Sequence, residues 1–287
     1  MKAKKSSIII SKWTTSLLGP KNNYRLRYYH QRGHFPNLTH PQDMSEILIN
    51  RLFDPIFCNN ISKYVDKIKV RDYIRVKGLG NILLKHYGEW EKPEQINFDL
   101  LPNKFILKAN NGCGNHYICR DKAKIDCSKA INILNKSLLS GKNHVEQHYH
   151  FIEPKVFCEE LINTGSKSLP IDYKFTCING EIVDIFVACE RESNAKYCTL
   201  DTNWQVLPYT KQEYLPEQIP KRPKHLSDLL DVAKQLGKDF AFVRVDLYEY
   251  RDQPYFSELT FFPWGGLLYS YTDEAIKKYG AKFRGNL

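Results

Sequence analysis

The sequence of 287 residues lacks a long hydrophobic run. No segment approaches the roughly 20 consecutive apolar residues that a membrane-spanning helix needs, so we predict no transmembrane helix. Residues 14–19 resemble the apolar part of a signal peptide only loosely, and no small-x-small cleavage site accompanies them. We therefore expect a cytoplasmic protein without a secretion signal.

Cysteine pairs with metal-binding or redox spacing are also missing. The eight cysteines include no Cys-x-x-Cys pair, so the sequence gives no support for zinc. Several cysteines lie within apolar stretches, where a reduced thiol behaves as a small hydrophobic group. Without a secretion signal, this pattern predicts free thiols in a reducing compartment. The Gly-x-Ser-x-Gly, Walker A and dinucleotide-binding motifs are absent as well.

Acidic residues are absent from positions 1–42, which contain eight lysine and arginine residues. The whole chain has 42 basic and 32 acidic residues, and residues 101–287 are nearly neutral. Such a concentrated positive charge indicates a polyanionic partner: an acidic polysaccharide, the inner face of a membrane, or nucleic acid. The alternative is a solvated or partly disordered arm without a partner.

We divide the chain into two regions. Residues 1–100 form a basic N-terminal arm and a mainly helical region, in which Asp43 is a candidate N-cap for a helix that ends near Phe53. Residues 61–86 have mixed helical spacing, and residues 101–287 alternate strands and helices. The predicted strands are 105–110, 116–120, 155–162, 172–178, 181–188, 241–247 and 255–262, and the predicted helices are 127–150, with a break at Gly141, and 226–236. Hairpins between helices are typical of an α+β fold.

The most informative pattern is the last predicted hairpin. A symmetric turn near Asp252 places Asp246 opposite Glu258 and Arg244 opposite Thr260, and the strand period puts all four on one face. The opposite face is apolar. Two facing carboxylates repel each other, and a hard cation such as Mg²⁺ would remove that repulsion. A charged, solvent-facing sheet in which Arg244 relieves the repulsion is the alternative.

A glycine-containing loop, Asn111-Gly112-Cys113-Gly114-Asn115, joins two predicted strands. Glycines allow backbone N–H groups to approach phosphate oxygens, and Lys108 lies just upstream. Lys174 lies within an apolar strand, where the Asn179-Gly180 turn places it opposite Ile185. Both lysines would suit nucleotide phosphates. An ordinary glycine hairpin and a lysine that extends to solvent are the alternatives.

Two further groups of polar residues need weighing. Glu159 and Glu160 close a strand, where they would accept hydrogen bonds from adenine and ribose, or else lie exposed at its end. His144, Glu146 and His148 have the order His-x-Glu-x-His rather than that of a zinc protease. We expect these residues, with His150, on a solvent-exposed helix or loop.

The order of these motifs resembles that of the TupA-like branch of the ATP-grasp superfamily over roughly residues 60–280. The resemblance is carried by residues 66–73, 101–115, 119–122, 158–161, 172–175, 242–246 and 258–263. Two departures occur. Asn111 and Cys113 replace the usual His and Ser of the glycine loop, and Thr260 stands where general ATP-grasp enzymes have Asn.

The resemblance implies an ATP-grasp fold, in which two α+β subdomains enclose ATP. The residues implied to bind ATP are Lys108, Asn111, Gly112, Gly114, Glu159, Glu160, Leu161 and Lys174. The residues implied to hold one or two Mg²⁺ ions are Asp246, Glu258 and Thr260. Arg244 is implied to stabilise an acyl phosphate, with Lys174 as a second catalytic residue, and the glycine loop would close over the phosphates.

By the same resemblance, the activity is that of an ATP-dependent carboxylate–amine ligase in capsule, teichuronopeptide or O-antigen synthesis. Its carboxylate would belong to a uronic-acid glycan or to a nucleotide- or lipid-linked sugar, and its second substrate would be an amine or amino acid. The basic arm would associate with the inner membrane surface. A sugar phosphotransferase using the same ATP site is the alternative enzyme. A nucleic-acid-binding protein is disfavoured because no reading motif is present.

Overall fold

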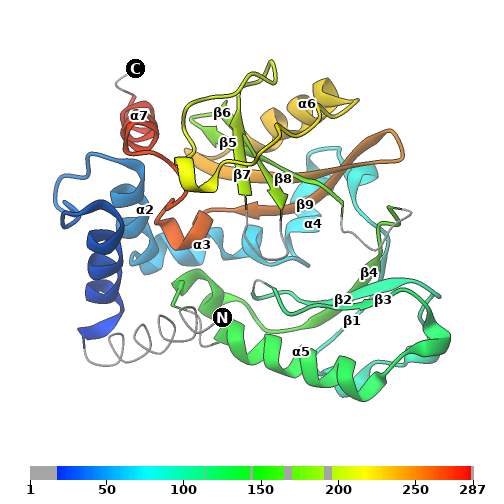
Figure 1. The fold of residues 1–287 in the computed structure, drawn as a ribbon. Helices are drawn as coiled ribbons and strands as arrows, with labels where there is room; N and C mark the ends of the chain where they lie inside the picture. Colours follow the sequence, from blue (N-terminus) through cyan, green and yellow to red (C-terminus); the bar gives the residue numbers. More distant parts are fainter. Residues whose placement is uncertain (1–17, 113, 143–144, 165–169, 191–195, 286–287) are drawn as a thin grey trace.

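The structure is a computed structural model that describes all residues except 1–17, 113, 143–144, 165–169, 191–195 and 286–287. Two antiparallel sheets, each with a helix on one face, are joined to a group of N-terminal helices (Figure 1). This arrangement confirms the predicted α+β fold class. Within the described residues, every helix is too short or too polar to cross a bilayer.

The N-terminal helices are a helix over residues 18–32, α2 (Met44–Leu52), α3 (Pro55–Val65) and α4 (Val70–Val76). The predicted N-cap at Asp43 is confirmed: its carboxylate accepts from the Glu46 N–H at 2.9 Å, and the Glu46 carboxylate accepts from the Asp43 N–H at 3.2 Å. This reciprocal pair satisfies two N–H groups that a helix start leaves without partners. Pro55 begins α3, where its missing N–H costs no helical hydrogen bond.

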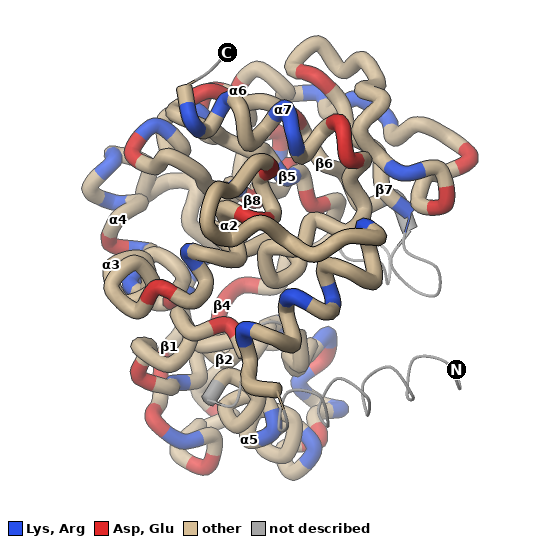
Figure 2. The backbone as a smooth tube through the Cα atoms, turned by 90° about the vertical axis from the view of Figure 1, so that its left-hand side faces the viewer, with Lys and Arg blue, Asp and Glu red and all other residues tan. Residues whose placement is uncertain are grey.

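Residues 18–42, predicted as part of a basic arm, are folded against the body of the molecule. Tyr24 and Tyr28, one helical turn apart, are 2% and 1% exposed. The Tyr28 hydroxyl donates to Asp43 at 2.6 Å, and the Arg32 guanidinium donates to the carbonyls of Leu268 and Tyr271 at 2.9 and 3.0 Å. In Figure 2, which faces this side, Lys and Arg positions follow the segment. One face of this segment is therefore buried in the core, and its other face carries positive charge.

The first sheet has the strand order β1-β4-β2-β3. Its elements are β1 (His86–Trp90), β2 (Phe105–Ala109), β3 (Tyr117–Cys119), β4 (Val156–Glu160) and α5 (Cys127–Lys142). Phe105 and Leu107 pack with Leu134 of α5 in one apolar cluster. Because side chains alternate along a strand, Lys108 lies on the face away from α5, as the sequence predicted.

The second sheet has the strand order β7-β6-β5-β8-β9. Its elements are β5 (Asp172–Ile178), β6 (Glu181–Glu190), β7 (Lys196–Leu200), β8 (Phe242–Tyr250), β9 (Gln253–Thr260) and α6 (Leu226–Gly237). The buried side chains of α6 and the apolar face of β8 belong to the main core, with Val243, Val245 and Leu247 fully buried. The other face of β8 and β9 carries the predicted polar residues.

The remaining elements connect and cover these layers. Helix α7 (Asp273–Phe283) packs against α2. The short 3₁₀ helices are η1 (Gly80–Ile82), η2 (Pro93–Gln95), η3 (Phe98–Leu100), η4 (Lys122–Lys124), η5 (Gln147–Phe151), η6 (Gln212–Tyr214) and η7 (Pro263–Gly266). Two of them matter for the site, because η5 precedes β4 and η7 follows β9.

The predicted register of the last hairpin is confirmed at its polar positions. Arg244 pairs with Thr260 and Asp246 with Glu258, although a bulge after Asp246 shifts the pairs nearer the turn. The register predicted for the Asn179-Gly180 hairpin is wrong at Lys174. A bulge between Thr176 and Cys177 places Lys174 opposite Phe186 rather than Ile185. An extra residue in one strand changes every pair beyond it.

Candidate active site

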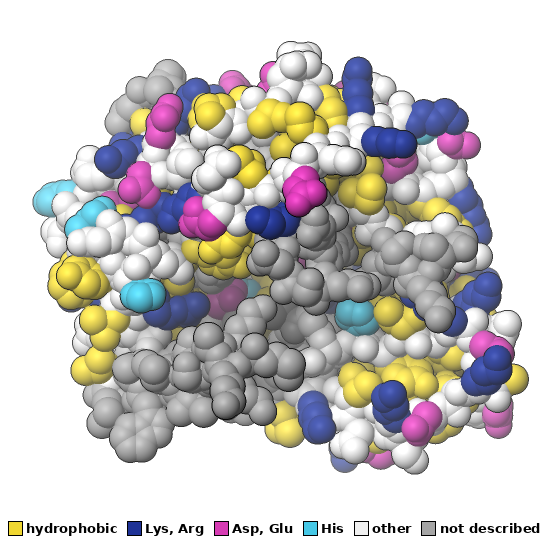
Figure 3. Space-filling model, in the orientation of Figure 1, with side chains coloured by type: hydrophobic (Ala, Val, Ile, Leu, Met, Phe, Trp, Pro, Cys, Tyr) yellow, Lys and Arg dark blue, Asp and Glu magenta, His cyan; other side chains and the backbone are white. Residues whose placement is uncertain are grey.

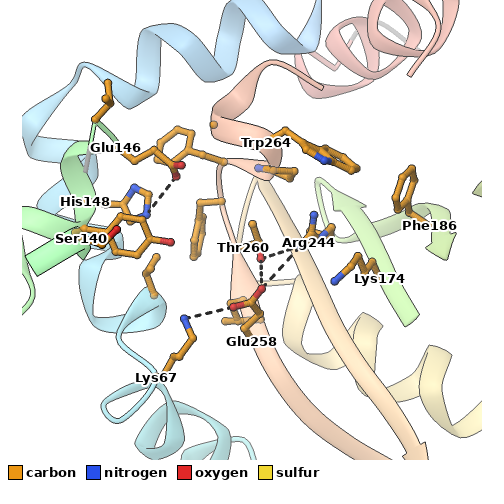
Figure 4. A pocket seen from close by; sticks show the side chains of 18 of the residues that line it. Lys67, Ser140, Glu146, His148, Lys174, Phe186, Arg244, Glu258, Thr260 and Trp264 are labelled. Carbon is orange, nitrogen blue, oxygen red and sulfur yellow. Dashed lines mark hydrogen bonds and ion pairs between the residues drawn. The ribbon is translucent and has the colours of Figure 1, made fainter. Parts of the chain in front are cut away.

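A cavity of about 950 Å³ lies against the polar face of the second sheet. Lys174, Arg244, Glu258 and Thr260 line one side of it, and Lys67 lines it from the connection between α3 and α4 (Figure 4). The opposite wall comes from the helix over residues 18–32 and from the segment around η5. On the face seen in Figure 3, the coloured acidic and basic side chains are interspersed. Charged side chains from elements far apart in the sequence, such as Lys67, Lys174 and Glu258, meet at this cavity.

Asp246 lies beneath this cavity as a buried anion between two cations. It is 0% exposed, and its carboxylate accepts from Arg244 Nε and Nη2, both at 2.7 Å, and from Lys174 Nζ at 2.6 Å. Lys174 also pairs with Asp172. Burial acts to lower the pKa of Lys174, but Asp246 and Asp172 outweigh it and raise that pKa. Because Asp246 pairs with both Lys174 and Arg244, both side chains keep their positive charge although they are buried.

Glu258 and Thr260 present oxygen atoms to the cavity. Arg244 Nη2 donates to Thr260 Oγ1 at 3.2 Å, and Glu258 lies 3.5 Å from Lys67 Nζ and 3.9 Å from Arg244 Nη2. Burial acts to raise the pKa of Glu258, but Lys67, Lys174, Arg244 and Lys108 together lower it to about 2. Glu258 is thus a carboxylate at any physiological pH.

The donor set fits a hard cation. Glu258 and Thr260 supply oxygen ligands at the cavity wall, while the oxygens of Asp246 already accept three hydrogen bonds from Arg244 and Lys174. The described residues contain no group of three or more His, Cys, Asp or Glu that would hold a metal by themselves. Mg²⁺ commonly uses one or two carboxylates together with substrate phosphates. In this structure, the repulsion between Asp246 and Glu258 is offset by lysine and arginine.

Lys67 is a site residue to which the sequence analysis gave no role. Its Nζ donates to the Gly112 carbonyl at 2.8 Å, and its N–H donates to the Asn110 carbonyl at 3.3 Å. Asp66 fixes this turn by accepting from the backbone N–H groups of Ile68 and Lys69. Lys67 therefore connects the predicted phosphate loop to Glu258. Its only signal in the sequence was its place within residues 66–73, which carry the family resemblance.

The predicted phosphate loop packs against the end of α5. Asn111 is 0% exposed, and a Cβ on Gly141 would lie 2.1 Å from the Asn111 carbonyl oxygen, so only glycine fits there. Gly114 has a φ of 72°, in the left-handed region that glycine adopts freely. Cys113 lies outside the described residues. The loop is thus fixed at Asn111 by its packing against α5, and it bends at Gly114, where the backbone conformation favours glycine.

The remaining predicted nucleotide residues lie on the first sheet. Lys108 pairs with Glu159, which also lies 3.9 Å from Arg71. The Glu160 carboxylate lies 3.5 Å from Arg251, and Leu161 is 7% exposed. These residues are outside the described lining of the cavity, yet Lys108 helps to lower the pKa of Glu258. The predicted residues thus form one group at the cavity and one on the first sheet and its loop, and Lys67 contacts both through Glu258 and Gly112.

The histidine segment is not the exposed surface that we expected. His148 is 3% exposed, belongs to η5 and stacks on Phe262 with ring centroids 5.2 Å apart, whereas His150 is exposed. Glu146 lies 3.7 Å from His148 and lines the cavity with it. His144 lies outside the described residues. Packing against α3 and the stacking of His148 on Phe262 bury this part of the segment despite its polar local sequence.

An aromatic wall adjoins Arg244. Trp264 of η7 has a φ of 51°, and the two glycines after it also have positive φ. This turn places the Trp264 ring 5.8 Å from the Arg244 guanidinium and 4.9 Å from the Phe186 ring, between centroids. Non-glycine residues in this conformation are strained, and such strain is concentrated at functional sites. The wall offers a flat apolar surface beside a fixed cation.

Comparison with known proteins gives a match to one family. The TupA-like ATPgrasp model matches residues 47–284. No curated protein gives a significant match.

Similar solved structures include two D-alanine–D-alanine ligases. The ligase from Bacillus anthracis has a TM-score of 0.43 and 18% identity, covering 77% of this chain and 64% of that one. The ligase from Helicobacter pylori has a TM-score of 0.42 and 16% identity, covering 76% and 60%. D-cycloserine synthetase DcsG has a TM-score of 0.47 and 14% identity, covering 81% and 78%. The chain spans less than two thirds of the length of either D-alanine–D-alanine ligase.

Proposed function

Because the chain belongs to the TupA-like ATP-grasp family, we propose that it joins a carboxylate to an amine at the expense of ATP, through an acyl phosphate. The family match confirms the predicted family and the ATP-grasp fold, and the ligase activity is part of the proposal. The substrates, the metal and the roles of individual residues form part of the proposal.

The observation that carries the proposal is the convergence of Lys67, Lys174 and Arg244 around one cavity, with Glu258 between them. Phosphoryl transfer spreads negative charge over phosphate oxygens, and prearranged cations stabilise that charge. A carboxylate does not react with amines at neutral pH, and phosphorylation gives it a good leaving group. The cations would therefore serve both the triphosphate and the acyl phosphate.

Glu258 and Thr260 would hold Mg²⁺, whereas the oxygens of Asp246, the third predicted ligand, are occupied by Arg244 and Lys174 in this structure. The ion would supply neutralisation of phosphate charge when bound. Asp246 has a further role within this chain, because it orients the Arg244 guanidinium by accepting two hydrogen bonds from it. Arg244 then directs its remaining donors toward the cavity, where the acyl phosphate and the tetrahedral oxyanion would form.

The adenosine end of the site is proposed on the first sheet. Lys108 and the loop with Asn111, Gly112 and Gly114 would bind phosphates. Glu159, Glu160 and the backbone at Leu161 would bind adenine and ribose. Glu159 pairs with Lys108 in this structure, so binding would exchange that ion pair for contacts with nucleotide.

For the carboxylate, we propose a uronic acid of a glycan or of its nucleotide- or lipid-linked precursor. The aromatic wall of Phe186 and Trp264 beside Arg244 supports this choice, because the apolar face of a pyranose packs well on an aromatic ring while Arg244 meets its carboxylate. The basic N-terminal segment would follow the remaining anionic glycan or a membrane surface in the cytoplasm. Capsule, teichuronopeptide or O-antigen synthesis is the proposed context.

A panel of uronic acids with ATP, Mg²⁺ and hydroxylamine tests the proposal. Hydroxylamine should replace the amine and give a sugar hydroxamate, with one ADP and one phosphate released. Glu258→Gln and Lys174→Met should remove this turnover, whereas Glu217→Gln, an exposed site away from the cavity, should not. If the enzyme instead gives a stable phosphorylated sugar and releases no free phosphate, it is a phosphotransferase rather than a ligase.

A further inference from the structure

The wall of the cavity opposite Arg244 has no role in the proposal above. Tyr24 and Arg27 reach it from the helix over residues 18–32, and Glu146 and His148 reach it from the segment before β4. Figure 4 shows Glu146 and His148 across the cavity from Lys174 and Arg244. The wall presents one basic and one acidic group next to each other.

This wall is fixed relative to the reaction centre. The Tyr24 hydroxyl packs so closely on Gly265 that a Cβ there would lie 2.6 Å from it, and His148 stacks on Phe262. Phe262 and Gly265 follow directly after β9, which carries Glu258 and Thr260. The side chain of Glu146 is 14% exposed. Substrates bound at the two walls would therefore be held in a defined relation to each other.

The charges around Glu146 favour a carboxyl group that exchanges its proton near neutral pH. Burial raises its pKa to about 8, against the opposing effect of Arg27, and the Glu258 charge adds to the rise. Among the described residues, the groups facing it include Arg27 and Tyr24 from the N-terminal helix, His148 of η5, Glu258 of β9 and Cys58 of α3. A general base works best when its pKa lies near the working pH.

We propose that this wall binds the amine substrate, that the amine is an amino acid, and that Glu146 is the general base for its attack. This inference rests on the proposed function. Arg27 would pair with the carboxylate of the amino acid and Glu146 with its ammonium group. The α-carboxylate of an amino acid would give Arg27 an anionic partner that a simple amine does not provide.

The chemistry balances with these groups. The Glu146 carboxylate takes one proton from the ammonium, which frees the nitrogen lone pair. The nitrogen attacks the acyl carbon and forms the C–N bond, and the C–O bond to phosphate breaks with its electron pair leaving on phosphate. The departing phosphate takes the second proton from nitrogen and becomes hydrogen phosphate. Glu146 then returns its proton to solvent.

Binding without turnover gives the first test. Proteinogenic L-amino acids and their decarboxylated analogues are titrated, with a non-hydrolysable ATP analogue and Mg²⁺ present, and followed by saturation-transfer NMR. At least one amino acid should bind, and Arg27→Met and Glu146→Gln should each weaken it by about ten-fold or more. Arg222→Met and Glu217→Gln, both exposed and outside the lining, should bind as wild type does. Absence of amino-acid binding, or equal binding of the decarboxylated analogue, overturns the inference.

Turnover gives the second test. Hydroxylamine is uncharged at pH 7 and needs no base, so Glu146→Gln should keep hydroxamate formation within about two-fold while losing about 100-fold in kcat with the amino acid. A purely structural role for Glu146 would lower both rates equally and would overturn the inference. Absence of hydroxamate from the wild-type enzyme would overturn the proposed function instead, and the binding test would still decide the amino-acid site.

Discussion

At the scale of single residues, the site is dominated by buried charges that hold one another. Asp246 is enclosed by Arg244 and Lys174, and these cations have further partners in Thr260 and Asp172. Such groups are costly to bury singly, because each lost partner leaves an uncompensated charge. The same arrangement leaves the cations charged and oriented before any substrate arrives.

The first prediction follows from Asp246. Asp246→Asn should lower the free energy of unfolding by on the order of 3 kcal/mol, because Arg244 and Lys174 lose their shared anion within the fold. Urea unfolding of the wild type and variant measures this. The total loss of unfolding free energy in the double variant Asp246→Asn/Lys174→Met should be smaller than the sum of the losses in the two single variants. Simple additivity would show that the pair is not coupled.

The second prediction concerns Glu146 and pH. Its pKa is about 8 in the folded chain and about 4.5 when unperturbed, so between these values the unfolded chain releases a proton that the folded chain keeps. Wild-type stability should therefore fall with rising pH across this window, by up to about 1.4 kcal/mol per pH unit from this group.

Glu146→Gln removes that pH-dependent cost. The variant should gain stability over wild type as pH rises from 5 to about 8 and keep a constant difference above it. Thermal unfolding at several pH values measures the difference, with Glu217→Gln as the control. A difference that does not change with pH would mean that Glu146 is ionised throughout.

At the scale of elements, the β8–β9 hairpin places the site and the turn after it shapes the cavity. The bulge after Asp246 keeps Asp246 opposite Glu258 while the strands close through Arg251 and Asp252, both at positive φ. Beyond β9, η7 turns sharply, so that Trp264 enters the cavity and Gly265 meets the N-terminal helix. The hairpin thus organises both walls.

The third prediction tests this docking. Gly265→Ala should destabilise the protein by more than Gly33→Ala, because both residues have positive φ, 65° and 78°, but only the Cβ at 265 would meet Tyr24. We expect about 1–2 kcal/mol for Gly33→Ala from backbone strain alone, and a larger loss for Gly265→Ala. Calorimetry of both variants measures it. Equal losses would show that Tyr24 moves aside without cost.

At the scale of the whole molecule, the basic N-terminal region divides into two parts with different consequences. Residues 18–42 bring Tyr24 and Tyr28 into the core and connect through Arg32 to residues 268–271. This packing means that positive charge and stability are carried by the same segment. A deletion of the entire region therefore cannot report on charge alone.

The fourth prediction separates these effects. Removal of residues 1–42 should cost several kcal/mol and lower the midpoint of thermal unfolding, because it removes two buried tyrosines and the Tyr28–Asp43 hydrogen bond. Removal of residues 1–17 leaves these contacts in place and should cost less. Thermal unfolding compares the two chains. Equal losses would contradict a structural role for residues 18–42.

The fifth prediction concerns the charge itself. In the full chain, replacing the exposed Lys21 and Arg25 by Gln should raise the apparent KM for an anionic glycan acceptor, more at low salt than at high salt, and leave the KM for ATP unchanged. Steady-state kinetics at two salt concentrations measure both constants. A rise in the KM for ATP would place this segment at the nucleotide end of the site.

The sequence by itself determined the features that depend on neighbours along the chain. The capping box at Asp43 and Glu46 and the α+β succession follow from local propensity. The pairing of Asp246 with Glu258 was predicted from a symmetric turn near Asp252, and it holds because a bulge after Asp246 compensates for the shifted pairs nearer the turn. The order of short motifs was enough to predict the family, since each motif is itself a local pattern.

Only the tertiary structure decided which distant residues meet. A bulge between Thr176 and Cys177, just before the Asn179-Gly180 turn, changed the partner of Lys174, and the local sequence pattern did not predict this bulge. Lys67 reaches Glu258, Tyr24 packs on Gly265, and Glu146 is buried across the cavity, all through contacts between segments far apart in the chain. Whether these side chains are buried and charged depends on the elements packed around them, and those elements come together only in the folded molecule.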